Sequence, residues 1–241
     1  MIARNSFRAV KRTWRFLQGR DFWQKVQIRC EQLRLGNAGA DWRLCPAGLS
    51  KHSVIYSFGV GEDISFDLQL IQKFGSIVHA FDPTPRSIEW IAMQSVSSNL
   101  RFHPFGVAHY DGSCKFFPPF DPSHVSHTVL ERESARPAVE LPVQKLTTIM
   151  SHLGHDKIDL LKMDIEGAEY SVLADLLSSG IRVDQLLVEF HHRFPEVGVD
   201  KTKSAIKTLN AAGYRVFSVS PTGEEFGFLR LDDSSGLGSG A

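Results

Sequence analysis

Cysteine is scarce in this chain of 241 residues, and neither sign of charge is in excess. Cys30, Cys45 and Cys114 are widely spaced and form no CxxC pair, which argues against a disulfide framework and against a zinc site. Lysine plus arginine numbers 27, as does aspartate plus glutamate, so no overall field predicts a nucleic-acid partner. No apolar run approaches the roughly 18 residues of a membrane-spanning helix, and the N-terminus lacks the apolar core of a signal peptide. We therefore expect a cytoplasmic protein.

What the chain does contain is a repeated switch between the strand period of two residues and the helical period of about 3.6. Strands are predicted at 54–58, 76–81, 100–105, 158–163, 186–190, 214–219 and 226–231, and helices at 64–74, 88–92, 147–153, 168–176 and 201–212. This alternation predicts an α/β protein with a doubly wound sheet and an antiparallel edge strand. Asp111-Gly112 predicts a hairpin between 107–110 and 114–117, and 118–142 is expected to be a long loop.

The ends of the chain differ in character from its middle. With 42% hydrophobic residues, residues 46–232 suffice for one large domain, and 233–241 is expected to be a flexible tail. Residues 1–45 are expected to form a basic amphipathic helical extension, because Phe7, Val10, Trp14 and Leu17 fall on one helical face among arginines and lysines. Such a helix can lie on an anionic membrane surface, but packing on the domain or on a second subunit is the interpretation we favour.

A glycine-rich turn follows the first long strand. Residues 57–63 read Ser-Phe-Gly-Val-Gly-Glu-Asp, so the backbone can approach a ligand closely and the next helix presents its N–H groups to it. Asp82 ends the next strand, where an acid can accept hydrogen bonds from ribose hydroxyls. Glu62 and Asp63 would repel a pyrophosphate but suit S-adenosylmethionine, whose sulfonium and ammonium are both positive. A helix cap is the simpler interpretation of Asp63, and both can hold.

Charged residues also crowd the end of a later strand, in the run Lys-Met-Asp-Ile-Glu-Gly-Ala-Glu at 162–169. The carboxyl end of a parallel strand opens into the ligand crevice, and Lys162 and Asp164 share one face of the strand. Clustered carboxylates at Asp164, Glu166 and Glu169 with a neighbouring histidine could hold magnesium. Because Lys162 neutralises Asp164 more simply, we expect an orienting pair and no metal site.

Several segments together resemble the FkbM family of methyltransferases. They are Val54-Ile-Tyr-Ser-Phe-Gly-Val-Gly-Glu-Asp-Ile-Ser-Phe66, His79-Ala-Phe-Asp-Pro83, Phe105-Gly-Val-Ala108 with Asp111-Gly112, the run at 162–169, and Glu189-Phe-His191. The resemblance extends from about Val54 to Arg230 and implies a class I, Rossmann-like fold with a seven-stranded sheet. It also implies S-adenosylmethionine as cofactor and O-methylation of a hydroxyl on a sugar, glycolipid or natural product. Ser57 departs from the usual Asp of the family, and Asp82 from the usual Glu.

The resemblance carries site residues onto this chain. It implies cofactor contacts for the methionine part at Gly59, Gly61, Glu62 and Asp63, for the ribose at Asp82, and for the adenine at Phe81, Pro83, Gly106 and Val107. A hydroxyl acceptor must also lose its proton, and His191 at a strand end is the predicted base, with Asp164 and Lys162 as the other catalytic residues. A histidine that is merely solvated or packed is the simpler alternative for His191. Residues 126–128 are predicted to close over the site as a lid.

Two other classes of function stay open at this stage. An NAD-dependent oxidoreductase shares the glycine turn and the acid, although no Tyr-x-x-x-Lys pair accompanies them. A catalytically silent methyltransferase-like module would bind lipid or RNA through the basic segment at 1–45, although no aromatic-rich RNA-recognition motif is present. We favour the methyltransferase, acting on a small-molecule or glycan hydroxyl without a nucleic-acid partner, and a homodimer is an additional expectation.

Overall fold

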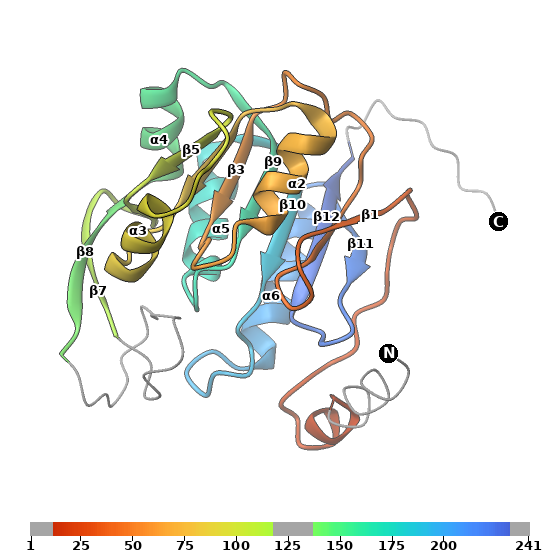
Figure 1. Ribbon diagram of the computed structural model, residues 1–241. Helices are drawn as coiled ribbons and strands as arrows, with labels where there is room; N and C mark the ends of the chain where they lie inside the picture. The colour runs from red at the N-terminus through yellow and green to blue at the C-terminus, as the bar shows by residue number, and fades with distance from the viewer. Residues whose placement is uncertain (1–11, 118–136, 232–241) are drawn as a thin grey trace.

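The core of the fold is a mixed seven-stranded sheet (Figure 1). The computed structural model describes residues 12–117 and 137–231. The sheet has the order β11-β12-β10-β9-β3-β4-β5. Its strands are β3 (Ile55–Phe58), β4 (Val78–Phe81), β5 (Leu100–His103), β9 (Lys157–Met163), β10 (Arg182–Glu189), β11 (Tyr214–Val219) and β12 (Glu225–Arg230). All seven predicted strands are therefore present, and the expected doubly wound α/β sheet is confirmed.

The antiparallel strand lies one place inside the sheet, and not at its edge as predicted. β12 runs antiparallel both to β10 and to β11, so the outermost strand, β11, has the same direction as β10. Helix α6 (Val199–Ala211) connects β10 to β11 and leaves a gap one strand wide, which β12 then fills. The sequence shows that the last two strands pair, but it does not show which of them takes the inner place.

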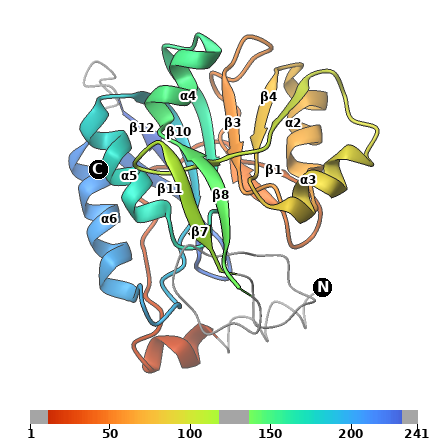
Figure 2. The ribbon, with the colours of Figure 1, turned by 90° about the vertical axis from the view of Figure 1, so that its left-hand side faces the viewer.

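Helices cover both faces of the sheet (Figure 2). One face packs on α4 (Leu146–Leu153), α5 (Glu169–Ser179) and α6, which bury residues such as Leu146, Leu173 and Leu209. The opposite face packs on α2 (Ser65–Phe74) and α3 (Pro85–Ala92). Successive strand residues alternate between these two cores, since Tyr56 belongs to the first and Ile55 to the second. Burial on both faces explains why these strands are nearly continuous apolar runs.

A short hairpin, and not a long helix, leads into the domain. The described chain begins in a helix that ends at residue 17, and the helical extension expected as far as residue 45 gives way to β1 (Leu33–Leu35) and β2 (Trp42–Leu44), which pair antiparallel. Buried Gln185 of β10 fixes this hairpin: its side chain accepts a hydrogen bond from the backbone N–H of Cys45 at 2.7 Å and donates one to the Cys45 carbonyl at 3.0 Å. The hairpin therefore lies against the second face of the sheet.

A small three-stranded sheet lies beside the main one, in the order β6-β8-β7. The hairpin predicted around Asp111-Gly112 is wrong, because β6 (Gly106–Val107) and β7 (Gly112–Phe116) each pair with β8 (Val139–Gln144) and not with each other. Asp111 instead accepts hydrogen bonds from the backbone N–H of Lys145 and the hydroxyl of Thr148 at the start of α4. Strand β8 begins within the predicted loop at 118–142 and extends past its end to residue 144, while residues 118–136, with the predicted lid, lie outside the described residues.

The N-terminal segment is attached to the domain through buried polar groups. Asp21 pairs with Arg12 at 3.5 Å and with Arg193 at 2.6 Å, and Phe22 lies in the main core. In contrast, Trp14, at 62% exposure, and Trp23, at 61%, are turned to solvent. Among residues 12–117 and 137–231, no helix combines the length and the apolar composition needed to cross a bilayer.

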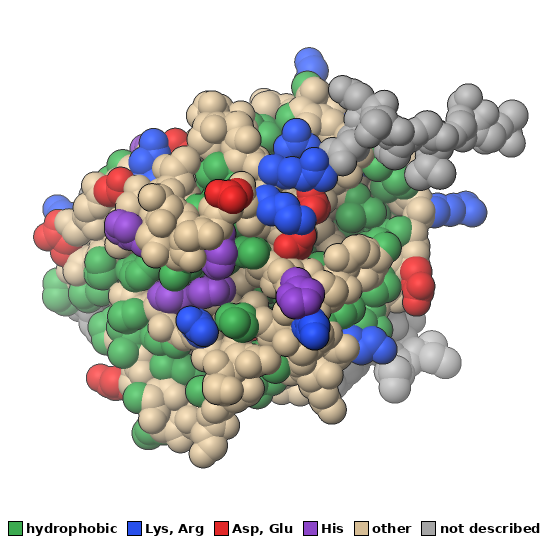
Figure 3. All heavy atoms as spheres, turned by 90° about the horizontal axis from the view of Figure 1, so that it is seen from above, with side chains coloured by type: hydrophobic (Ala, Val, Ile, Leu, Met, Phe, Trp, Pro, Cys, Tyr) green, Lys and Arg blue, Asp and Glu red, His purple; other side chains and the backbone are tan. Residues whose placement is uncertain are grey.

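Three histidines, from β4, from the end of β5 and from the turn before β9, form a cluster. Nδ1 of His79 lies 3.0 Å from Nε2 of His103, and the ring of His155 meets that of His79 edge-on. Figure 3 shows histidine side chains gathered on the face seen from above. Burial first of all, together with the charges of His103, His155 and Arg101, lowers the pKa of His79 to about 4.

We expect this cluster to weaken the fold at acid pH. Because the folded state holds His79 neutral, its contribution to stability is present above the unfolded pKa of about 6.5 and is lost as the pH falls toward the folded pKa of about 4. One extra proton taken up on unfolding changes the free energy of unfolding by up to about 1.4 kcal/mol per pH unit. Urea unfolding between these pH values should show a shallower dependence in His79→Gln than in the wild type. Equal slopes in the two proteins would contradict this assignment.

Candidate active site

A cavity of about 360 Å³ opens at the carboxyl ends of β3, β4, β9 and β10. All nine predicted cofactor residues line it, together with Lys162 and Asp164. They are Gly59, Gly61, Glu62, Asp63, Phe81, Asp82, Pro83, Gly106 and Val107. The structure thus brings the glycine turn and the charged run at 162–169 to one site, as expected from the parallel order of β3 and β9.

The glycine turn and the charged run touch directly at Gly59. Gly59 has φ +73°, and a Cβ at this position would overlap the carbonyl oxygen of Asp164. The N–H of Gly59 donates to the carbonyl of Phe81 at 2.9 Å, and the N–H of Asp164 donates to the carbonyl of Phe58 at 3.2 Å. Gly59 is therefore required both by its backbone conformation and by the close approach of the Asp164 backbone.

Asp82 fixes the glycine turn from the neighbouring strand. Its Oδ2 accepts a hydrogen bond from the N–H of Gly61 at 3.0 Å. Its Oδ1 accepts from the N–H of Thr84 at 2.9 Å and from the Thr84 hydroxyl at 2.6 Å. The carboxylate is buried yet lines the cavity, so it both shapes the turn and faces the space predicted for the ribose.

The two acids at the start of α2 have separate partners. Glu62 pairs with Arg86 at 2.8 Å. Asp63 accepts a hydrogen bond from the N–H of Ser65 at 2.8 Å and one from the side-chain amide of Asn37 at 3.3 Å. The N-cap residue of α2 is Ile64, without a side-chain cap bond, so the prediction of Asp63 as the cap is wrong by one residue. Asp63 still satisfies the N–H of Ser65 in the first turn, and its carboxylate lines the cavity.

Lys162 does not form the ion pair with Asp164 that the sequence predicted. Its ammonium donates hydrogen bonds to the carbonyls of Gly59 at 2.9 Å and Phe58 at 3.3 Å, and it lies 5.4 Å from the centre of the Trp42 ring. No ion pair joins Lys162 to Asp164 in the described part of the chain. The strand period places both residues on one face as expected, but the ammonium is used by the glycine turn.

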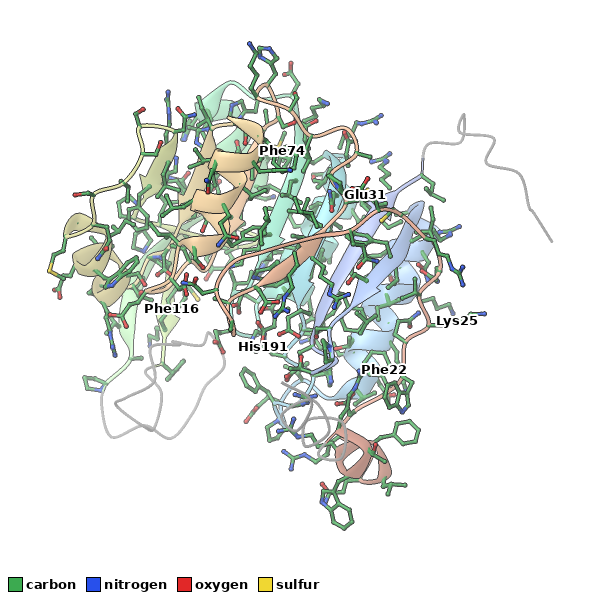
Figure 4. All side chains as sticks on the ribbon, turned by 45° about the vertical axis from the view of Figure 1, so that its right-hand side comes forward. Phe22, Lys25, Glu31, Phe74, Phe116 and His191 are labelled. Carbon is green, nitrogen blue, oxygen red and sulfur yellow. The ribbon has the colours of Figure 1, made fainter. Side chains whose placement is uncertain are left out.

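His191 lies just beyond β10, where Figure 4 shows it at the lower ends of the central strands. It is 6% exposed. Its Nδ1 lies 3.0 Å from Oε1 of Glu169, while Nε2 lies 3.4 Å from Glu166 and 3.8 Å from Asp164. Burial alone would lower the pKa of His191, but the carboxylates of Glu169, Glu166 and Asp164 outweigh burial and raise it well above its ordinary value.

Glu169 organises the turn that carries these acids. It is fully buried, and its carboxylate accepts hydrogen bonds from the backbone N–H groups of Ile165 and Gly167 at 3.0 Å. Glu166, which lies between Ile165 and Gly167, has a φ of +53°, a backbone conformation that residues other than glycine seldom adopt. One buried carboxylate therefore holds both the turn at 164–167 and the ring of His191.

Several acids of the cavity wall were not predicted from the sequence. Asp67 of α2 is nearly fully buried, and burial raises its pKa although Lys162 opposes that shift. Glu189 ends β10, and burial together with the carboxylates of Asp164 and Glu225 raises its pKa well above the ordinary value. The wall carries the acids Asp41, Glu62, Asp63, Asp67, Asp82, Asp164, Glu166, Glu189 and Glu225, with Lys162 as its one lysine or arginine within the described ranges. Such a wall favours a positively charged ligand.

Comparison with known proteins identifies the family of this chain. The model of the Methyltransferase FkbM domain matches residues 54–216. Two curated relatives, both named "Probable methyltransferase-like protein 24", match with 25% identity over 230 residues (Homo sapiens) and 26% over 221 residues (Rattus norvegicus). These alignments cover 85% and 80% of this chain but 56% and 54% of the relatives, so the chain spans about half the length of the curated relatives it matches.

Solved structures are similar at lower sequence identity. A methyltransferase FkbM from Methylobacillus flagellatus has 15% identity and a TM-score of 0.46, over 75% of this chain and 44% of that one. Fibrillarin from Aeropyrum pernix, solved with natively bound S-adenosyl-L-methionine, has 10% identity and a TM-score of 0.42, over 88% and 86%. The family model covers well over half of this chain, including the glycine turn, the run at 162–169 and His191. The chain therefore belongs to the FkbM methyltransferase family.

Proposed function

We propose that this protein transfers a methyl group to a hydroxyl of a sugar, glycolipid or other natural product. The observation that supports this most is the single cavity in which the glycine turn, Asp82 and the acidic turn at 164–167 meet. When bound, S-adenosylmethionine supplies a methyl group that an acceptor oxygen takes while the carbon–sulfur electron pair stays on sulfur. The family supports methyl transfer as such, and the hydroxyl acceptor is the part that we add.

The residues present fit this cofactor. The cavity volume of about 360 Å³ is that of a small-molecule site. Gly61 has no atom within 4 Å of a Cβ built on it, so a ligand can approach the backbone closely there, and a pyrophosphate would meet the carboxylates of Glu62 and Asp63. The acidic wall instead attracts the positive sulfonium and ammonium groups. This charge pattern favours the methyltransferase over the NAD-dependent alternative.

The chain's own residues divide the site into two ends. We propose that Gly59, Gly61, Glu62 and Asp63 face the methionine part, with Asp82 at the ribose and Phe81, Pro83, Gly106 and Val107 around the adenine. The acceptor then lies toward Asp164 and His191, where its oxygen can be aligned with the methyl group while water is excluded. Lys162 supports the site by holding the carbonyls of Phe58 and Gly59. His191 stays the predicted proton acceptor.

Ligand binding tests this function directly. S-adenosylhomocysteine at about 100 times its Kd should stabilise the fold by about 2.7 kcal/mol, which corresponds to a rise in Tm of roughly 5–10 °C for a domain of this size. NAD at the same concentration should leave the Tm unchanged. Methyl transfer from labelled S-adenosylmethionine to glycan or small-molecule hydroxyls should be abolished in Asp164→Asn. Stabilisation by NAD alone, or full activity of Asp164→Asn, would overturn the proposal.

Contact of the N-terminal segment with a membrane or a second subunit also remains a proposal. Trp14 and Trp23 are exposed next to the basic residues Arg20 and Lys25, which is the combination that binds anionic lipid surfaces. Sedimentation with anionic vesicles separates a membrane contact from a contact between subunits.

A further inference from the structure

Three side chains that can bind a metal ion meet beside the cavity, where Asp164 and Glu166 line it and His191 lies next to them without being part of the lining. Asp164 and Glu166 come from the turn after β9, and His191 comes from the end of β10. One ligand atom from each, two carboxylate oxygens and a ring nitrogen, lie within 4.8 Å of one another. The two strands are neighbours in the sheet, so the fold itself brings the three side chains together.

The second ring nitrogen of His191, Nε2, faces the carboxylates of Asp164 and Glu166. The side chain is 6% exposed, and its Nδ1 is engaged by Glu169 at 3.0 Å. Nε2 makes no hydrogen bond to residues 12–117 or 137–231, although the nearest carboxylate oxygen, from Glu166, is 3.4 Å away. The three carboxylates around the ring favour a positive charge at this position. A divalent cation on Nε2 would supply that charge in place of the ring proton, which leaves to solvent.

The support behind His191 has the form found around metal-binding histidines. Such a histidine commonly donates its second ring N–H to a carboxylate, which fixes the orientation of the ring. Here that carboxylate is the fully buried Glu169, which also accepts backbone hydrogen bonds from Ile165 and Gly167. Glu169 therefore fixes the histidine and, through the same turn, the positions of Asp164 and Glu166.

The position of Lys162 answers the part of the objection to a metal site that concerns a direct ion pair, although its charge still acts on Asp164. A lysine paired with Asp164 would neutralise that carboxylate and compete with a cation. The ammonium of Lys162 is instead bound to the carbonyls of Phe58 and Gly59. Asp164 therefore keeps an oxygen directed at His191, 3.8 Å from Nε2.

We propose that Asp164, Glu166 and Nε2 of His191 bind a divalent cation of the manganese or magnesium class. Two carboxylates and one imidazole combine the oxygen ligands preferred by magnesium and manganese with a nitrogen ligand that a first-row metal accepts. Three protein ligands leave further positions open, so the cation can hold an oxygen of the acceptor. The role of the cation in holding the acceptor rests on the proposed methyltransferase function, whereas the binding of the cation itself does not. A cation on Nε2 excludes that nitrogen as the proton acceptor, so this proposal replaces the role given to His191 above, and the cation would instead lower the pKa of the bound acceptor hydroxyl.

The test is a titration of the full chain with Mn²⁺ alone, followed by the electron paramagnetic resonance signal of free Mn²⁺. The wild type should bind one ion, and Mg²⁺ should compete for it. Glu166→Gln and His191→Gln should each raise the Kd at least about tenfold. Asp41→Asn is the matched control, because it removes one carboxylate from the cavity wall but none of the three ligands, and its Kd should equal that of the wild type.

Thermal stabilisation by S-adenosylhomocysteine keeps the two proposals apart. Glu166→Gln should retain this stabilisation while it loses Mn²⁺, which supports a cation site separate from the cofactor contacts. Absence of Mn²⁺ binding in the wild type, or equal weakening in Glu166→Gln and Asp41→Asn, would overturn the cation site and leave His191 as the base. Mn²⁺ binding that weakens in Glu166→Gln and His191→Gln, in a protein that S-adenosylhomocysteine does not stabilise, would uphold the cation site and reject the proposed function.

Discussion

Gly59→Ala is expected to lower the free energy of unfolding by about 3 kcal/mol or more and to abolish the response to S-adenosylhomocysteine. Two effects add at this position. The φ of +73° is unfavourable for alanine, and the new Cβ would overlap the carbonyl oxygen of Asp164. Relief of that overlap separates β3 from β9 at the point where Lys162 joins them, so the glycine turn loses its support.

Gly61→Ala is the matched control for this variant. Gly61 also has a positive φ, of +56°, but no atom lies within 4 Å of a Cβ built there. Only the backbone cost of about 1–2 kcal/mol remains. Urea unfolding and thermal shift should therefore rank the wild type first, Gly61→Ala second and Gly59→Ala last. Equal losses in the two variants would show that the contact with Asp164 has no separate effect.

Glu169→Gln is expected to lower the free energy of unfolding by about 3 kcal/mol and to remove methyl-transfer activity. The glutamine keeps the size of the side chain but removes a buried charge that faces His191 and two backbone N–H groups. Loss of one partner from a buried charge pair commonly costs about 3–5 kcal/mol. We expect the activity to be lost because Glu169 supports two parts of the site. These are the turn that carries Asp164 and the ring of His191.

Glu166→Gln supplies the comparison for Glu169→Gln. It makes the same chemical change three residues away, but the Glu166 side chain is 20% exposed whereas that of Glu169 is fully buried. We expect its effect on unfolding to stay within about 1 kcal/mol. Circular dichroism in urea measures both variants. A loss of stability in Glu166→Gln as large as in Glu169→Gln would show that Glu169 is not the organising residue of the turn.

The sequence predicted the elements that show a regular spacing of apolar residues, and the helix ends that are marked by glycine. The seven strands and the helices α2 to α6 follow from apolar spacing, and Gly75, Gly154 and Gly180 end three of these helices in the left-handed conformation. Strand β8 was missed because Pro142 counts against a strand. Pro142 is tolerated because β6 pairs only with Val143 and Gln144, so no hydrogen bond to β6 is needed from residue 142.

The site was predictable where its residues follow one another in the chain, and less so where they do not. The nine cofactor residues lie in short motifs at the ends of β3 and β4 or at β6, and the structure places all of them in one cavity. Asp67 was missed because an acid in the first turn of a helix is ordinary. The partners of Lys162 and His191 were not predictable, since Gly59 and Glu169 reach them through tertiary contacts that no spacing reveals.

The inner position of β12 has a consequence for the order of folding. β10 cannot gain its second neighbour until residues 225–230 have been synthesised. Until then the hydrogen-bonding edge of an entirely apolar stretch, Leu186 to Val188, stays open to other chains. The half of the sheet made of β5, β4, β3 and β9 can pair earlier. Aggregation during synthesis should therefore depend most on how soon β12 is synthesised and pairs with β10. Truncation before residue 225 should yield an insoluble chain.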